Sequence, residues 1–395
     1  MRPLRIAMLT YSLRPRGGVV HALEISRALA RRGNEVELIA LGPPGQSFFR
    51  EPAVRSRIIR HQPLESAFDE RIRSMLIAYR DGLAEPLRQG GFDLVHAQDC
   101  LSANAALELR DAGLIPHVLR TVHHVDDFRS PSLIECQNRS IVGPDALLCV
   151  SLPWIRRLGR EYGLTGRLVR NGVDTERYRP PRDGHERARA RAEFDLADRF
   201  TVLTVGGIEP RKGSLTLLEG FAHLRRVAAP GLDPLLVLAG GATLFDYLAE
   251  VDYFRALQSE LGLQGSVRVL GSLPDGELER LYRAADVFAF PSTKEGFGLA
   301  ALEALASGLP VVASELDALQ TFLEHQRSAL LHPVGDSRAL GEALIRLAHD
   351  PPTREALRAG GREPVAEYSW EQAAVEHERA YREVLRILEP VPARG

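Results

Sequence analysis

The chain has 395 residues, of which 45% are hydrophobic and 26% are charged, and its formal net charge at pH 7 is -2. This length exceeds what a single hydrophobic core usually serves, so we expect a globular protein of two domains. The nearly balanced charge argues against a nucleic-acid partner, which would favour a strongly basic chain.

Cysteine usage and hydropathy predict a cytoplasmic protein. Cys100, Cys136 and Cys149 show neither paired nor metal-ligand spacing, which is typical of a reducing compartment without structural zinc. No apolar stretch suits a signal peptide or reaches the ~20 residues of a membrane span. The abundance of arginine, alanine and glycine indicates a bacterial coding bias, against which the only two lysines, Lys212 and Lys294, stand out.

Short apolar runs alternate with helical patterns along the whole chain. The runs predicted as strands in the first half are residues 5–11, 35–41, 92–98, 117–123 and 146–151. Those in the second half are residues 200–207, 235–241, 267–271, 287–292, 310–314 and 330–334. Runs this apolar are typical of parallel sheets covered on both faces by helices. We therefore predict an α/β protein with two doubly wound, Rossmann-like domains that face each other across a cleft, with ligands at the carboxyl ends of the strands.

The segment 169–191 separates the two series of strands. Its Asn-Gly pair, Pro-Pro pair and arginine-rich run predict a linker, and the run alternates with Glu and Ala as a solvated helix face does. The predicted domains are residues 1–172 and 173–368. A closing segment, residues 369–395, begins with a Ser cap and is expected to form a helix that packs back on the first domain.

A glycine pair follows the first predicted strand. Gly17 and Gly18 precede an amphipathic helix, where backbone N–H groups and the helix dipole can hold a phosphate or a sugar. A tight turn alone explains the pair equally well. The spacing is not G-x-G-x-x-G, which weakens a dinucleotide-binding interpretation.

Two histidines end a later strand of the first domain. His123 and His124 are followed by Asp126 and Asp127, and polar groups at strand ends are where bound ligands are contacted. For His124 we favour a backbone-bonded structural histidine, and for the two aspartates a helix cap. No third ligand accompanies them, so a metal site is not favoured.

In the second domain, the stretch TVGGIEPRKGS places a basic loop between a strand and a helix. The loop carries Arg211 and Lys212. A fixed cation at a helix N-terminus suits a diphosphate, because the positive charge and the free N–H groups stabilise a leaving anion. A chance basic turn is the alternative.

The stretch STKEGFGLAALEALASGLPVVAS, residues 292–314, contains a predicted buried helix with one carboxylate inside it. That carboxylate, Glu303, must find a partner, which is either a diol or an arginine in a structural ion pair. Gly296 and Gly298 open the helix with N–H groups that can bind phosphate oxygens. Glu295 lies just outside the helix and can reach a sugar hydroxyl.

These segments, in this order, resemble the retaining glycosyltransferases of the GT-B fold, family 4. The resemblance covers nearly the whole chain and is carried by TVHH, VRNGVDTERYRP, VGGIEPRKG and the E-G-F-G stretch with its second Glu. It implies a hexosyltransferase-like enzyme of class EC 2.4, with an acceptor-binding first domain and a nucleotide-sugar-binding second domain.

The resemblance also implies roles for single residues. Glu303 would bind the ribose hydroxyls of a nucleotide sugar, Glu295 would contact the donor sugar near its 3- and 4-hydroxyls, and Lys212 would neutralise the diphosphate. The candidate catalytic residues are His123, which would meet the donor sugar, Lys212 and Glu295. The candidate donor-binding residues are Gly18, Arg211, Gly296, Phe297, Gly298, Leu299 and Glu303, of which Gly296 to Leu299 would act through the backbone.

One departure from the family pattern concerns charge near the diphosphate. The family often has G-R-L-x-x-x-K-G, whereas Gly207 occupies the arginine position here. We hypothesise that Arg211 supplies part of the missing charge. Lys294 is interpreted as a solvated loop charge.

The implied reaction develops negative charge on the diphosphate and positive charge on the sugar ring. Cations and N–H dipoles can stabilise the first, so we expect no cofactor and no metal. The expected partners are a nucleotide-diphosphate sugar and an unidentified acceptor, either a small molecule, a lipid or a saccharide. The arginine-rich region 48–87 could contact an anionic lipid surface, but its acidic residues favour a solvated face.

Three alternatives remain open on the sequence. The first is another nucleotide-sugar enzyme of the GT-B fold, such as an epimerase. The second is a Rossmann-type oxidoreductase, against which the missing G-x-G-x-x-G argues. The third is a catalytically silent binding module, which the complete set of Lys212, Glu295 and Glu303 disfavours.

Overall fold

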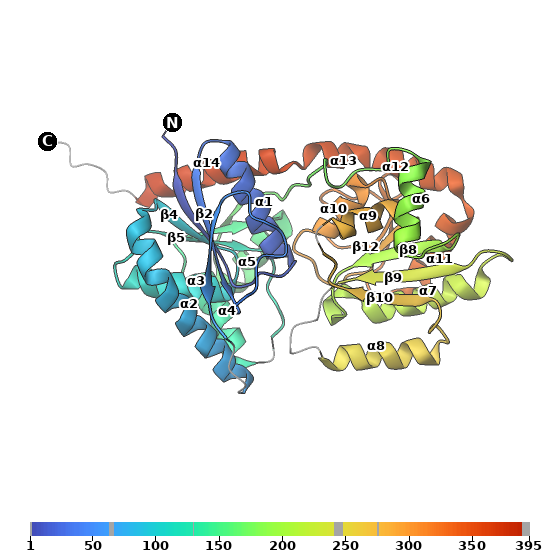
Figure 1. The fold of residues 1–395 in the computed structure, drawn as a ribbon, viewed down its shortest axis with the longest axis horizontal. Coiled ribbons are helices and arrows are strands. Elements are labelled where there is room, and N and C mark those ends of the chain that lie inside the picture. Colours follow the sequence, from blue (N-terminus) through green and yellow to red (C-terminus); the bar gives the residue numbers. More distant parts are fainter. Residues whose placement is uncertain (1, 63–66, 129, 241–247, 275, 389–395) are drawn as a thin grey trace. The chain divides into compact units, whose positions relative to one another are not determined.

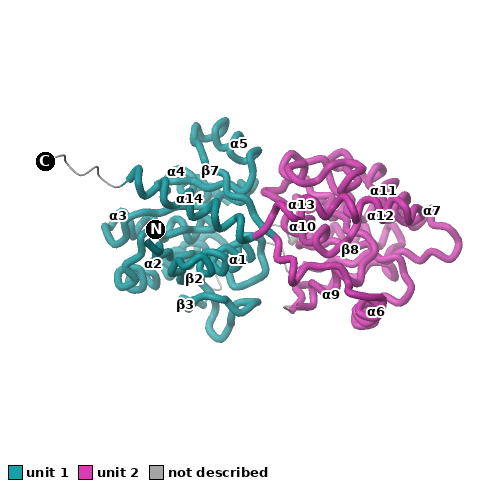
Figure 2. The backbone as a smooth tube through the Cα atoms, turned by 90° about the horizontal axis from the view of Figure 1, so that it is seen from above, with its two compact units in different colours: residues 1–172, 370–395 teal, residues 173–369 magenta. Residues whose placement is uncertain are grey.

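The computed structural model describes residues 2–62, 67–128, 130–240, 248–274 and 276–388. The chain divides into two compact units (Figure 2). Unit 1 comprises Met1–Gly172 and Trp370–Gly395, and unit 2 comprises Val173–Ser369. Residues 389–395 of the predicted closing segment lie outside the described residues.

Unit 1 is built on a parallel sheet with the strand order β3-β2-β1-β4-β5-β6-β7 within the described residues. The outermost strands, β3 and β7, were not predicted, because β3 is an exposed, arginine-rich edge and β7 is very short. The other five lie within the predicted runs, apart from one extra residue at the end of β2. The strands are β1 (Arg5–Thr10), β2 (Glu35–Gly42), β3 (Arg55–Arg60), β4 (Leu94–Ala97), β5 (Val118–Val122), β6 (Ala146–Cys149) and β7 (Gly166–Leu168).

Two sets of helices cover the two faces of this sheet (Figure 1). Ala7 and Leu9 of β1 belong to a core that also contains Tyr79, whose hydroxyl donates to backbone carbonyls of β1 and β2. Met8 alternates to the other face, where the closing helix packs along the first helix. The helices are α1 (Gly17–Arg31), α2 (Phe68–Gly90), α3 (Cys100–Asp111), α4 (Pro131–Val142), α5 (Leu152–Tyr162) and α14 (Trp370–Leu388).

Unit 2 has a second parallel sheet, with the strand order β10-β9-β8-β11-β12-β13 within the described residues. All six strands were predicted to within two residues at each end, because they form short apolar runs, of which β9, β11, β12 and β13 are buried throughout. The strands are β8 (Phe200–Val205), β9 (Pro234–Ala239), β10 (Val267–Gly271), β11 (Val287–Phe290), β12 (Val311–Ser314) and β13 (Ala329–His332).

Helices surround the second sheet. They are α6 (Gly184–Glu193), the short 3-10 helix η1 (Pro210–Lys212), α7 (Ser214–Val227), α8 (Leu248–Glu260), α9 (Glu277–Ala284), α10 (Leu299–Ala306), α11 (Ser337–His349), α12 (Pro351–Gly360) and α13 (Arg362–Glu367). The arginine-rich part of the segment 169–191, interpreted as a solvated helix face, forms α6. There α6 packs on α9, and Arg187 and Arg191 form ion pairs with Asp286. The partners of this polar helix, α9 and Asp286, are distant in the sequence, and Asp286 follows Arg187 by 99 residues.

The direction of chain winding reverses once in each sheet. In unit 1 the reversal lies between β1 and β4, and in unit 2 it lies between β8 and β11. The loops that leave two such strands run to opposite faces, so their carboxyl ends leave room for a ligand. Residues that follow these strands are therefore the first candidates for a functional site.

Candidate functional site

In unit 2, the polar side chains at the point of reversal come from two loops. Lys212 ends η1 after β8, and Glu295 follows β11, which is the neighbouring strand. Lys212 Nζ donates to Glu295 Oε1 at 2.6 Å, and Ser292 Oγ donates to the same oxygen at 2.9 Å. The sheet topology thus brings together two residues that lie 83 positions apart.

The lysine side chain is held along its length. Its ammonium group lies 4.8 Å from the centroid of the Phe290 ring, a cation–π contact. A Cβ on Gly206 would lie only 3.1 Å from Lys212 Cε, so the stem of the lysine covers this glycine. The backbone N–H of Thr293 also donates to the Arg211 carbonyl at 2.8 Å, which joins the two loops.

Four charged side chains lie close together at the carboxyl ends of β8 and β11, namely Lys212, Glu295, Arg211 and Glu209. Burial lowers the pKa of Lys212, although Glu295 opposes this shift. Burial alone would raise the pKa of Glu295, but Lys212 and Arg211 outweigh it and the pKa is lowered. Arg211 lies 3.7 Å from Glu295 and forms a 3.1 Å ion pair with Glu209. Glu295 is therefore ionised at neutral pH, and the role of Arg211 towards a diphosphate stays a hypothesis.

The loop after Glu295 leads into α10 through a left-handed glycine. Gly298 has φ +101°, and a Cβ there would lie 2.4 Å from Leu319 Cδ2. The positive φ favours glycine at this position, because other residues rarely adopt it without strain. The first helical hydrogen bonds are donated by Ala301 and Leu302 to the Gly298 carbonyl, so the N–H groups of Leu299 and Ala300 precede the helical ladder.

Phe297 fixes this loop by packing rather than by polar contacts. Its ring is buried, stacks on Phe322 with centroids 5.2 Å apart and meets Tyr368 at 5.5 Å. Only its backbone is available to a ligand, as is the case for Gly296 and Gly298, which have no side chain. The predicted backbone role of this segment is compatible with the geometry.

Glu303 is buried in the middle of α10 and meets a tyrosine. The Tyr282 hydroxyl, on α9, lies 3.2 Å from Glu303 Oε2 and 3.1 Å from the Ala300 carbonyl. Tyr282 is fully buried and packs against Phe288 and Tyr178. Its position is therefore rigid, and its hydroxyl fixes one oxygen of the carboxylate.

In unit 1, Gly18 and His123 lie side by side. A Cβ on Gly18 would be 3.4 Å from His123 Cδ2, so α1 begins directly against the imidazole ring. His123 Nε2 lies 2.9 Å from Gln98 Oε1, the side chain that follows β4. Burial, with the neighbouring histidines, lowers the pKa of His123 well below its usual value. The imidazole is therefore neutral at pH 7.

The structure corrects one interpretation of the first domain. Asp126 and Asp127 do not cap a helix, because α4 begins at Pro131 with Ser130 as its N-cap; instead, Asp126 lies 3.1 Å from His124. Cys100, Cys136 and Cys149 carry free thiols.

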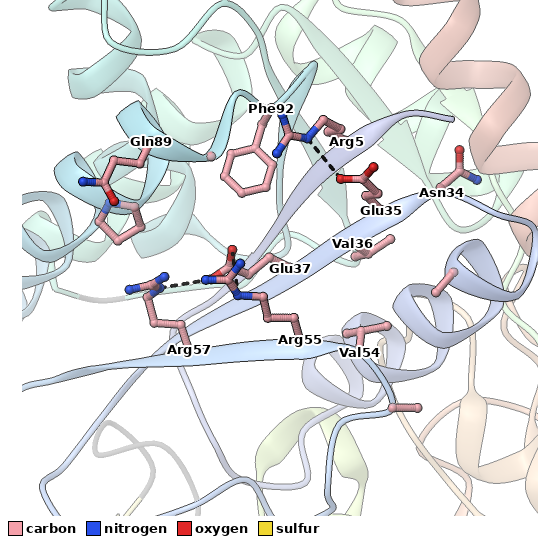
Figure 3. Close-up of a pocket in the computed structure, with 14 residues that line it drawn as sticks. Arg5, Asn34, Glu35, Val36, Glu37, Val54, Arg55, Arg57, Gln89 and Phe92 are labelled. Carbon is pink, nitrogen blue, oxygen red and sulfur yellow. Dashed lines mark hydrogen bonds and ion pairs between the residues drawn. The ribbon is translucent and has the colours of Figure 1, made fainter. Parts of the chain in front are cut away.

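Several arginines of the region 48–87 pair with acidic residues of neighbouring elements, as Arg50 does with Glu24. Arg55 and Arg57 both pair with Glu37 in a cavity of about 550 Å³, and Arg5 pairs with Glu35 in the same place (Figure 3). Arg5, Glu35 and Arg55 are the first residues of their strands. The cavity therefore lies at the amino-terminal ends of the strands, whereas His123 follows the carboxyl end of β5. The charges favour the solvated face over a lipid-binding surface; Glu65, one of the acidic residues considered there, lies outside the described residues.

Sequence reasoning missed Gln98, Ser292 and Tyr282. Gln98 and Ser292 are each within the first two polar residues after a buried strand, which is a usable signal at a point of reversal. Tyr282 carries no such signal, because its hydroxyl finds Glu303 only through the packing of α9 on its neighbours.

Comparisons with known proteins place this chain in a family. The model of "Glycosyltransferase Family 4" matches residues 15–177, and that of "Glycosyl transferases group 1" matches residues 186–363. A D-inositol 3-phosphate glycosyltransferase of Saccharomonospora viridis is 31% identical over 97% of this chain and 95% of its own length. The chain belongs to glycosyltransferase family 4.

Solved structures agree with the fold of this family 4 glycosyltransferase. Sucrose-phosphate synthase of Thermosynechococcus elongatus has a TM-score of 0.80 and 26% identity, covering 98% of this chain and all of its own. HepE of Anabaena, solved in complex with UDP-glucose, has a TM-score of 0.75 and 18% identity, covering 97% of this chain and all of its own. The predicted GT-B fold and the transferase class EC 2.4 are confirmed.

Family membership also bears on the alternatives. An epimerase, an oxidoreductase and a silent binding module are not favoured, since the relatives are named glycosyltransferases. No helix in the part of the chain that the structure describes is long and apolar enough to cross a membrane. Across the same described ranges, no three His, Cys, Asp or Glu side chains are grouped so that they could hold a metal ion.

Proposed function

We propose that this family 4 glycosyltransferase moves a sugar from a nucleotide-diphosphate sugar to an acceptor, with retention of the anomeric configuration and without a metal. The observation that carries the proposal is the contact between Lys212 and Glu295 at the carboxyl ends of β8 and β11. A cation for the diphosphate and a carboxylate for the sugar hydroxyls are held there side by side, next to the N-terminus of α10.

Lys212 and the α10 N–H groups would act on the leaving group. The bond between the anomeric carbon and the phosphate oxygen breaks, and its electron pair goes to the diphosphate. Lys212 and the N–H groups of Leu299 and Ala300 stabilise that charge where it develops. The acceptor oxygen forms the new bond on the same face, and its proton passes to a phosphate oxygen.

Glu303 and Arg211 complete the proposed donor site in unit 2, and the resemblance to the family adds His123 and Gly18 of unit 1. Glu303 accepts hydrogen bonds from the ribose hydroxyls, with Tyr282 holding its second oxygen. Arg211 adds positive charge in place of the arginine absent at Gly207. His123 contacts the donor sugar and Gly18 approaches the phosphates, roles that rest on the family resemblance alone.

A donor screen tests the proposal. UDP-glucose, GDP-mannose and ADP-glucose are each added to the purified chain, and the melting temperature is measured, since a ligand that binds the native state raises it. One of them is expected to raise the melting temperature of the wild type but not of Lys212→Ala. If none of these or other nucleotide sugars stabilises the wild type at millimolar concentration, the donor class is wrong.

The acceptor and the stereochemistry need separate measurements. D-inositol 3-phosphate, named for the relatives, is the first acceptor to try, followed by cell extract with mass spectrometry of the products. The anomeric proton of the purified product is then examined by NMR. Retention gives the same anomer as the donor, and an inverted product would refute the same-face mechanism.

A further inference from the structure

A buried polar cluster that the proposed function does not use is joined to His123 through Gln98. It lies on the face of the unit 1 sheet opposite Tyr79 and is formed by residues of α1, β4, β5 and α14. His96 of β4 bonds to the Tyr381 hydroxyl of α14 through Nδ1 and to the Thr121 hydroxyl of β5 through Nε2, each at 2.7 Å. The side chain of Gln98 connects this cluster to His123.

The surroundings of the Gln98 amide determine which of its ends faces His123. Its nitrogen lies 3.0 Å from Met8 Sδ and at 3.4 and 3.3 Å from the two ring nitrogens of His96. An atom nearly equidistant from both ring nitrogens lies over the face of the ring, since an in-plane position would collide with a ring carbon. That face and the thioether sulfur are both electron-rich, so they attract N–H and repel a carbonyl oxygen.

The carbonyl oxygen of Gln98 therefore faces His123 and can only accept. Its partner, Nε2 of His123 at 2.9 Å, must carry the proton. In a neutral imidazole the other nitrogen, Nδ1, then has a free lone pair. The Cδ2–Nε2 edge of the ring faces Gly18 and Gln98, which leaves the Nδ1 edge on the other side of the ring.

We propose that Gln98 is a positioning residue that locks His123 in the Nε2–H tautomer, so that Nδ1 accepts a hydrogen bond from a hydroxyl group of the donor sugar. The inference rests on the proposed function, in which His123 contacts that sugar. His96 and Tyr381 support Gln98 from below, so α14 contributes indirectly to the orientation of the ring.

The tautomer is measured directly by 15N NMR on the full chain labelled at its 12 histidines, with His123→Gln identifying the signal. The wild type is expected to show a protonated Nε2 and an unprotonated Nδ1 at His123 without any ligand. Gln98→Leu, which removes the acceptor, is expected to shift His123 towards the Nδ1–H form. Gln98→Asn keeps the amide on a shorter side chain and is expected to retain more of the wild-type tautomer than Gln98→Leu does.

Kinetics separate positioning from mere packing. With the donor selected from UDP-glucose, GDP-mannose and ADP-glucose, Gln98→Leu is expected to lower kcat about tenfold with little change in donor KM, and Gln98→Asn to lower it less. The matched control is Asn34→Leu. It removes another buried amide with two hydrogen bonds, at the amino-terminal end of β2 and away from His123. It is expected to lower the melting temperature as much as Gln98→Leu does but to leave kcat unchanged.

An Nδ1–H tautomer in the wild type overturns the inference, as does a Gln98→Leu variant that keeps both the tautomer and kcat. The NMR measurement needs no donor, so it decides the inference even if no nucleotide sugar is turned over. Turnover combined with the wrong tautomer contradicts the role of Gln98 and leaves the proposed function standing.

Discussion

Glu295 and Glu303 belong to the same motif but lie in different surroundings. Glu295 contacts Lys212 and Ser292 in a loop, whereas Glu303 lies inside a helix against a buried tyrosine. A group that is rigidly held away from the reacting bond contributes binding equally in the ground state and the transition state. A carboxylate that holds the sugar ring beside the reacting anomeric carbon acts mainly by orienting that carbon in the transition state.

This difference predicts a division between kinetic constants. Glu303→Ala is expected to raise the donor KM by about 10- to 100-fold with little change in kcat, because it removes a charged hydrogen-bond acceptor. Glu295→Ala is expected to lower kcat by about 100-fold with little change in KM. Steady-state kinetics with the selected donor measures both, and equal effects of each substitution on both constants would contradict the division.

Tyr282 gives a finer test at the same scale. Tyr282→Phe removes the hydroxyl that lies 3.2 Å from Glu303 and keeps the ring that packs on Phe288. Donor affinity measured by calorimetry is expected to fall by about five- to tenfold. Tyr253→Phe, at an exposed position of α8, serves as the matched control and should have no effect. An unchanged affinity for Tyr282→Phe would mean that Glu303 is oriented without it.

At the scale of elements, the packing of α1 and α14 on the unit 1 sheet buries several neutral histidines. Burial lowers the pKa of His21 to about 4 and that of His377 to about 3, and it lowers the pKa of His96 well below 6.5. In the unfolded chain these groups titrate near 6.5. Below that pH the unfolded state binds more protons than the native state, so acid favours unfolding.

The free energy of unfolding is therefore expected to fall as the pH decreases from about 6.5 to about 4. Each of these histidines contributes a slope of about 1.4 kcal/mol per pH unit, and none of them contributes above pH 7. Urea unfolding at several pH values measures the slope. His377→Gln should reduce it by one histidine's share, whereas His349→Gln, an exposed position of α11, should not. A slope that His377→Gln does not change would show that His377 is not buried in its neutral form.

Elements also differ in how well the sequence predicts them. Central strands such as β1, β8 and β11 are buried on both faces, so their apolar runs are visible in the sequence. β3 has the sequence RSRIIR and gains its partners only by pairing with β2 at the sheet edge. The alternating charges of α6 indicate a helix face, but its ion pairs with Asp286 are not visible in the sequence. The local sequence pattern therefore does not predict a contact that depends on residues distant in the sequence.

For the whole molecule, both sheets place their candidate residues by the same rule. The chain reverses between β1 and β4 and again between β8 and β11, and Gly18, Gln98, Lys212 and Glu295 follow those four strands. Motifs predicted three of these residues, because glycine, lysine and glutamate beside glycine stand out in sequence. Gln98 was not predicted, since its role depends on contacts with Met8, His96 and His123 that only the folded sheet creates.

The two lysines of the chain allow the most direct test of the central claim, that Lys212 stabilises the leaving diphosphate of a nucleotide sugar. The measurement is the steady-state release of nucleoside diphosphate from the selected donor by the wild type, Lys212→Ala and Lys294→Ala. Lys212→Ala is expected to lower kcat by about 100-fold or more, whereas Lys294→Ala should stay within about twofold of the wild type. A Lys212→Ala variant that releases nucleoside diphosphate as fast as Lys294→Ala does would contradict the account.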